Sequence, residues 1–134
     1  PLRLELGPTE IEKAQCELVR RDNGEKVFVP LDGIEETVKT MLDDVQQGLF
    51  EKAKRNLDEN TYACSSLEEV KEKMAQRGGF AKTMWCGDLE CELKMKEEAG
   101  VSSRCIPLEQ EHLGDVCPVC GKPAKHMVYW GVAY

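Results

Sequence analysis

No apolar run in the 134-residue sequence approaches the roughly 20 residues that a membrane-spanning helix needs, so we expect no membrane partner. An N-terminal secretory pattern is also missing, and the chain opens on a strand-like segment at Pro1 instead of Met. We therefore expect a fragment of a larger cytoplasmic protein. The sequence has no internal repeat and no low-complexity tract, while 41% of its residues are hydrophobic and 32% are charged. That balance is typical of a globular fold rather than a disordered chain.

Basic charge is also in short supply, because 18 Lys and Arg residues face 25 Asp and Glu residues, for a net charge of −7. Such a surface does not attract a polyanion as a whole, so any contact with nucleic acid needs a local basic cluster. One cluster surrounds a predicted hairpin and comprises Arg3, Arg20, Arg21 and Lys26. Asp22 and Glu25 lie among these cations. Composition alone therefore favours a solvated hairpin of alternating charge over a phosphate-binding surface.

Cysteine, by contrast, is abundant, with seven residues in the chain. The odd number argues against a disulfide framework. Three cysteines stand alone (Cys16, Cys64 and Cys105), and four form two close pairs: Cys86, Cys91, Cys117 and Cys120. Two loop-borne pairs are how a small domain supplies four thiolates to a tetrahedral zinc ion. Because all four positions would be filled by protein, the spacing predicts a structural Zn²⁺ site rather than a catalytic one.

Two other interpretations of the cysteines remain open from spacing alone. They could be unrelated buried or free thiols, or Cys117 and Cys120 could be a thioredoxin-like redox pair. The redox pair needs a helix directly after it, and Gly121-Lys122-Pro123 does not start one cleanly. His112 and His126 could replace a thiolate as ligands, but four cysteines already complete the set.

Alternation and helical periodicity predict a mixed α+β fold. We expect strands at residues 2–6, 17–21, 26–30, 80–85, 103–107 and 125–134. Asn23-Gly24 predicts a hairpin between the second and third of these. We expect a short helix capped by Thr9, and further helices at 34–57, 66–77 and 88–99, with a loop at 60–66. The helix at 34–57 carries one apolar stripe and is long enough to link two packing units.

Several segments, in chain order, resemble one family. They are residues 1–8 (PLRLELGP), 19–26 (VRRDNGEK), 85–91 (WCGDLEC), 103–107 (SRCIP), 120–124 (CGKPA) and the terminal Tyr134. Together they resemble the C-terminal end of prolyl-tRNA synthetases of the eukaryote/archaeal-like type, over the full length of the chain. The family pattern usually has Gly-Pro-Arg-Asp where this sequence has Gly-Pro followed by Thr9 and Glu10.

The resemblance implies a domain layout and a set of partners. Residues 1–31 would end a class II anticodon-binding domain, 32–61 would be a long linking helix, and 62–134 would be a small α/β zinc-binding domain with a short antiparallel sheet. The family is a cytosolic homodimer that joins proline to tRNA(Pro) using ATP and Mg²⁺. These would bind outside this segment, which would hold no catalytic residue. Arg3 and Lys26 match positions that contact the anticodon.

The apolar segment 128–134 is expected to pack rather than fray. The resemblance implies that the carboxylate of Tyr134 points towards the catalytic domain of the same chain. A rival from a different class is a stand-alone zinc-binding interaction module in a cytosolic complex.

Overall fold

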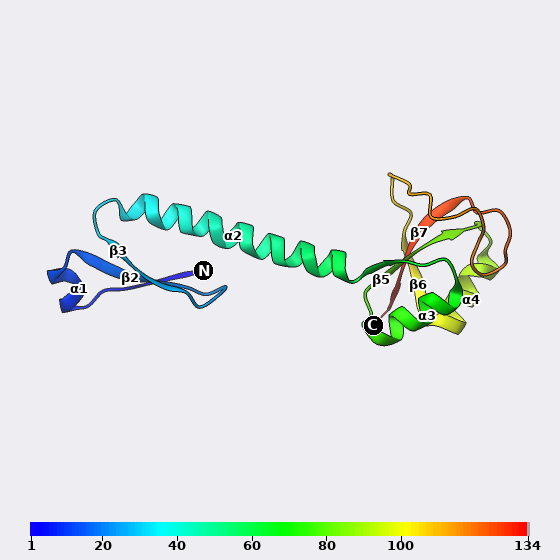
Figure 1. Ribbon diagram of the computed structural model, residues 1–134, viewed down its shortest axis with the longest axis horizontal. Helices are drawn as coiled ribbons and strands as arrows, with labels where there is room; N and C mark the ends of the chain where they lie inside the picture. Colours follow the sequence, from blue (N-terminus) through cyan, green and yellow to red (C-terminus); the bar gives the residue numbers. More distant parts are fainter. Residues whose placement is uncertain (134) are drawn as a thin grey trace. The chain divides into compact units, whose positions relative to one another are not determined.

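The computed structural model describes residues 1–133 as a mixed α+β protein (Figure 1). The contacts divide the chain into two compact units, residues 1–55 and 56–134, and the longest helix, α2 (Ile34–Glu59), runs through the division. We describe each unit by itself. The expected boundaries at 31 and 61 stay a prediction. Tyr134 lies outside the described residues.

The first unit consists of a three-stranded antiparallel sheet, the short helix α1 and most of α2. Its elements are β1 (Leu2–Glu5), α1 (Pro8–Glu12), β2 (Gln15–Arg20) and β3 (Lys26–Pro30), and the strands lie in the order β1-β2-β3. The α1 cap differs from expectation: the N-cap is Gly7, not Thr9, and the Glu10 carboxylate accepts from the Gly7 amide at 3.1 Å. Pro8 explains the earlier start, because proline suits the first helical position, where its missing N–H costs nothing.

Strand alternation gives this sheet one buried and one open face. Cys16, Leu18 and Val29 point to the face that α2 covers, where they pack against four partly buried residues: Leu31, Ile34, Val38 and Met41. The early part of α2 thus belongs to the core of the first unit. We call the other face the outer face. Because side chains alternate along each strand, the β1-β2-β3 register places the following residues on it: Arg3, Glu5, Gln15, Glu17, Val19, Lys26, Phe28 and Pro30.

The second unit packs two helices against one face of a mixed sheet. Its elements are β4 (Thr61–Ala63), α3 (Leu67–Gln76), β5 (Phe80–Trp85), α4 (Leu89–Ala99), β6 (Val101–Cys105) and β7 (His126–Val132). The strand order is β4-β5-β7-β6, with β4 parallel to β5 and the other pairs antiparallel. The expected loop at 60–66 contains β4, so the sheet is not purely antiparallel. Ser66 caps α3 by accepting from the Glu69 amide at 3.2 Å.

The core of this unit lies between the sheet and its helices. It comprises Cys64, Leu67, Val70, Met74, Ala81, Met95, Val101, Val128 and Trp130. The buried Trp130 indole donates to the Thr83 hydroxyl at 2.9 Å, and its ring meets that of Trp85 edge-on at 6.5 Å. Trp85 also packs against the cysteine cluster, so one aromatic side chain joins the hydrophobic core to that site.

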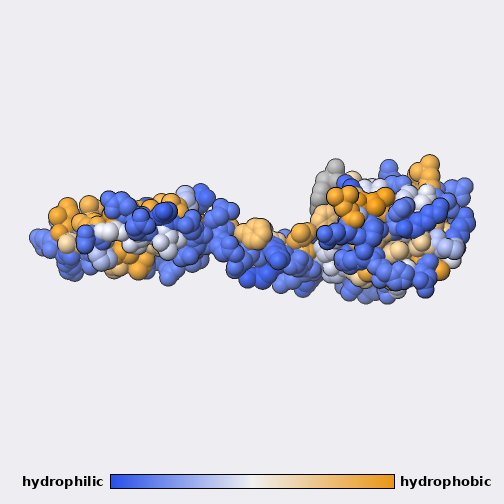
Figure 2. Space-filling view, turned by 90° about the horizontal axis from the view of Figure 1, so that it is seen from above, coloured by the Kyte–Doolittle hydropathy of each residue, from blue (hydrophilic) through white to orange (hydrophobic). Residues whose placement is uncertain are grey.

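The surface mixes hydrophilic side chains with scattered apolar ones (Figure 2). Phe28 and Phe50 are among the exposed apolar residues of the first unit, 55% and 59% exposed. Across residues 1–133, none of the helices combines the length and the apolar character that crossing a bilayer demands.

Candidate metal centre and basic sheet face

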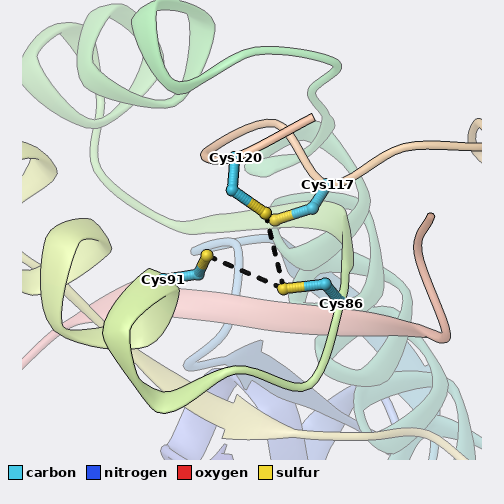
Figure 3. Close-up of side chains that lie close together, drawn as sticks. All are labelled: Cys86, Cys91, Cys117 and Cys120. Carbon is cyan, nitrogen blue, oxygen red and sulfur yellow. Dashed lines mark hydrogen bonds between the residues drawn. The ribbon is translucent and has the colours of Figure 1, made fainter. Parts of the chain in front are cut away.

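The four paired cysteines converge on one point in the second unit (Figure 3). Cys86 directly follows β5, and Cys91 lies in the first turn of α4. Cys117 and Cys120 come from a loop at 106–125 that contains no helix. Cys86, Cys91 and Cys117 are buried, whereas Cys120 is exposed. Three sulfurs thus face inward and one borders solvent.

The spacing of the sulfurs fits a tetrahedral metal. Zinc–thiolate bonds of about 2.3 Å place the sulfurs of a regular tetrahedron about 3.8 Å apart. The Sγ atoms of Cys86 and Cys91 are 3.6 Å apart, those of Cys86 and Cys120 are 3.7 Å apart, and all four lie within 4.8 Å of one another. A disulfide needs about 2.05 Å, and all seven cysteines are free. The cluster could therefore hold a metal ion.

Two similar turns frame the cluster. Each has the sequence Cys-Gly-X: Cys86-Gly87-Asp88 in one and Cys120-Gly121-Lys122 in the other. Both glycines have positive φ, +94° and +71°, which residues with a Cβ adopt at a cost. This backbone lets the amides of Asp88 and Lys122 hydrogen-bond to the Cys86 and Cys120 sulfurs. Backbone dipoles thus point at two sulfurs that would carry negative charge as metal ligands.

The same two X residues join the turns through their side chains. Lys122 Nζ lies 2.8 Å from Asp88 Oδ2. This contact raises the pKa of Lys122 and lowers the pKa of Asp88, since each charge stabilises the other. The cysteine spacing revealed neither residue as part of the site. The repeated Cys-Gly-X sequence was the available signal.

The thiols differ in how readily they lose a proton. Burial raises the pKa of Cys86 and of Cys91, whereas the hydrogen bond from the Lys122 amide lowers the pKa of Cys120 to about 7. A cation would have to displace protons from the buried thiols, so its affinity would fall as pH falls. The redox interpretation finds less support, because no helix follows Cys120 to stabilise a thiolate in the way a thioredoxin-like pair requires.

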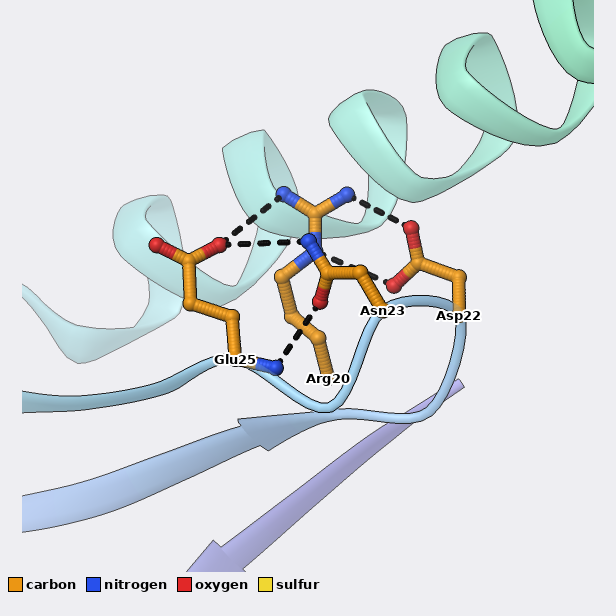
Figure 4. Close-up of polar contacts among 4 residues, drawn as sticks. All are labelled: Arg20, Asp22, Asn23 and Glu25. Carbon is orange, nitrogen blue, oxygen red and sulfur yellow. Dashed lines mark hydrogen bonds and ion pairs between the residues drawn. The ribbon is translucent and has the colours of Figure 1, made fainter.

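The structure separates the four predicted cations of the hairpin. Arg20 points under α2, with its side chain only 14% exposed, and its Nε and Nη2 atoms donate to Asp22 at 3.1 and 2.8 Å (Figure 4). The Asp22 hydrogen bond raises the pKa of Arg20, and the same bond lowers the pKa of Asp22. Arg20 therefore has a role in closing the hairpin, which its place among the other cations in the sequence did not reveal.

The other cations lie on the open side. Arg3 and Lys26 occupy one row of the outer face with Val19 between them, and their side chains are 66% and 56% exposed. Arg21 follows β2 and is exposed. Arg3 lies within ion-pair distance of Glu5, at 2.5 Å, and Lys26 lies 3.9 Å from Glu17. The outer face thus combines exposed cations with carboxylates.

Comparison with known proteins decides the family. The family described as "Prolyl-tRNA synthetase, C-terminal" matches residues 67–134. The chain belongs to the prolyl-tRNA synthetase family. All 134 residues are also similar to the proline–tRNA ligase 2 of Bacillus thuringiensis subsp. konkukian, at 56% identity, and to the proline–tRNA ligase of Ruminiclostridium cellulolyticum, at 57%. The proline–tRNA ligase of Clostridium novyi is 53% identical over the same span.

The chain spans 28% of the length of these ligases. The family match confirms the resemblance to prolyl-tRNA synthetases that the sequence segments indicated. The matched range of the family includes all four cysteines of the cluster.

Proposed function

We propose that this chain is the C-terminal portion of a cytoplasmic proline–tRNA ligase that contributes tRNA binding and a zinc-braced support rather than the chemistry. The observation that carries the proposal is the similarity to named proline–tRNA ligases along all 134 residues. Proline activation with ATP and Mg²⁺, and the catalytic domain itself, are assigned to the part of the ligase outside this chain. Dimerisation of the parent enzyme belongs to the same proposal, as does the approach of Tyr134 to its catalytic domain.

The outer face is the proposed tRNA-binding surface. Arg3 and Lys26 share one row of this face, and both are more than half exposed. Exposed Arg and Lys contact phosphates, while neighbouring carboxylates such as Glu17 can accept from the edge of a base. Arg21 extends the positive surface at the end of β2, whereas Arg20 is already paired with Asp22. The proposed surface therefore uses three of the four cations predicted from the sequence, Arg3, Arg21 and Lys26, as exposed positive charges.

The cysteine cluster is proposed to hold structural Zn²⁺. Four sulfurs at tetrahedral spacing leave no position for a reacting water, and three of them are buried. The ion would join the loop at 106–125 to β5 and α4. This loop has little regular secondary structure of its own. A stand-alone interaction module shares this metal chemistry, but the similarity to the ligases favours the synthetase.

Binding of a tRNA anticodon tests the proposal directly. We expect the 134-residue chain to bind an RNA hairpin with the tRNA(Pro) anticodon loop more tightly than one whose anticodon is replaced. The double variant Arg3→Gln/Lys26→Gln should weaken binding and reduce the slope of log K against log salt, because each lost phosphate contact removes about 0.7 from that slope. A variant with unchanged affinity and unchanged slope would refute the RNA-binding role of the outer face.

A further inference from the structure

Phe28 is an exposed aromatic residue on the outer face of the first unit. It lies on β3 two residues after Lys26, and strand alternation places both side chains on the same side of the sheet. Its ring is 55% exposed, although β-strand aromatics usually gain stability by burial. No other large hydrophobic residue of the outer face in β1, β2 and β3 is exposed. An isolated exposed ring of this kind is too small for a protein-docking patch.

The surroundings of Phe28 are charged rather than apolar. Glu17 is its direct cross-strand partner, and the adjacent row of the register holds Lys26, Val19 and Arg3. Directly paired and diagonal neighbours in a sheet lie within about 5–8 Å of one another. Phe28 therefore lies next to the Glu17 carboxylate and to Lys26, which is two residues away on the same face of β3, while Arg3 lies two strands away at the far end of the adjacent row. This combination suits a ligand that carries both a flat ring and a phosphate.

We propose that Phe28 is a stacking platform for an unpaired base of RNA, with Lys26 and Arg3 holding the adjoining phosphates. This inference rests on the proposed tRNA-binding function and adds a residue that the charge pattern did not identify. Single-stranded RNA is read by bases that stack on aromatic side chains projecting from a sheet. Each such stack contributes enough that its removal weakens binding about fivefold to 150-fold.

The experiment compares variants of Phe28 with a matched variant of Phe50. Phe50 is similarly exposed, at 59%, but lies on α2 away from the outer face. Anisotropy titrations would use the 134-residue chain and the RNA hairpin with the tRNA(Pro) anticodon loop. We expect Phe28→Leu to bind at least fivefold more weakly, Phe28→Tyr to bind like the wild type, and Phe50→Leu to have no effect. Phe28 is not among the residues of the buried cluster of the first unit, so the fold should survive each change.

Two further readouts separate stacking from a change in charge or fold. Fluorescence of 2-aminopurine placed in the RNA loop should fall when the wild-type chain binds and should stay high with Phe28→Leu at saturating protein. The salt slope should remain that of the wild type, because no phosphate contact is lost. If Phe28→Leu binds as tightly as Phe50→Leu while Arg3→Gln/Lys26→Gln binds weakly, the stacking role is refuted and the RNA surface stands. If neither variant loses affinity, the proposed function itself fails.

Discussion

Replacing Cys117 by Ser is the sharpest test of the metal centre. Cys117 is only 1% exposed and lies in the tetrahedral cluster. Its loss would remove one of four thiolates and leave a poor zinc site. The perturbation therefore acts on the second unit through the metal, and its size can be worked out from the linkage between binding and folding.

A ligand that binds only the folded state stabilises it by RT ln(1 + [L]/Kd), about 4 kcal/mol when free zinc is a thousand times Kd. For a unit of this size, each 1 kcal/mol shifts Tm by about 4–8 °C. Loss of zinc should then lower the Tm of the second unit by about 15–30 °C. Burying a serine hydroxyl in the cluster adds a separate cost of about 1–3 kcal/mol, which is independent of metal.

Chelation separates these two costs. The assay measures zinc per chain by mass spectrometry and Tm by calorimetry, for the wild type and Cys117→Ser, with and without a strong chelator. The wild type should hold one zinc and lose Tm on chelation, whereas the variant should hold none and respond little. Cys105→Ser is the matched control, because Cys105 is exposed and outside the cluster, so zinc content and Tm should stay near those of the wild type. A wild-type chain without metal, or with a Tm insensitive to chelation, would overturn the zinc proposal.

Two further predictions concern the fold. Gly79→Ala should destabilise the second unit by about 3 kcal/mol or more, since a Cβ at its φ of +94° would overlap the backbone oxygen of Asn60. Gly78→Ala, at φ +67° with open space around it, should cost only about 1 kcal/mol in urea melts, and equal losses would contradict the steric argument. In the first unit, Arg20 lowers the pKa of Asp22, so this pair stabilises the fold above the unfolded pKa near 4 and loses that effect as pH falls through the lower folded pKa. Asp22→Asn should therefore reduce stability at neutral pH and flatten its decline below about pH 4 in pH-dependent melts, and an unchanged acid profile would show that the pair contributes nothing.

Features with a strong local signal were predictable from the sequence. Strands β3 and β5 and the start of α2 lie where alternation and periodicity placed them, because each segment has a clear apolar pattern. The meeting of the four cysteines also followed from their spacing. Local chemistry alone was enough in these places.

Features set by distant partners were not predictable. The three residues of β4 form a strand because Thr61 pairs with Phe80, a contact that no local pattern encodes. The ion pair between Asp88 and Lys122 forms only when the fold brings two distant turns together. The burial of the Arg20 side chain depends on α2, which lies over the hairpin. Side-chain roles in a charged sequence thus depend on tertiary placement more than on residue type.

The order of strands in the second unit has a consequence for how that unit is made. β7, the last strand in chain order, lies between β5 and β6 in the sheet. Until residues 126–132 have left the ribosome, β6 has no strand partner and β5 pairs only with the three residues of β4. A nascent chain therefore exposes two unpaired edges throughout synthesis of the unit, and assembly of the sheet waits for one late insertion. Metal capture after Cys120 emerges would come just before that step, which gives the cluster a place in the timing of folding as well as in the finished structure.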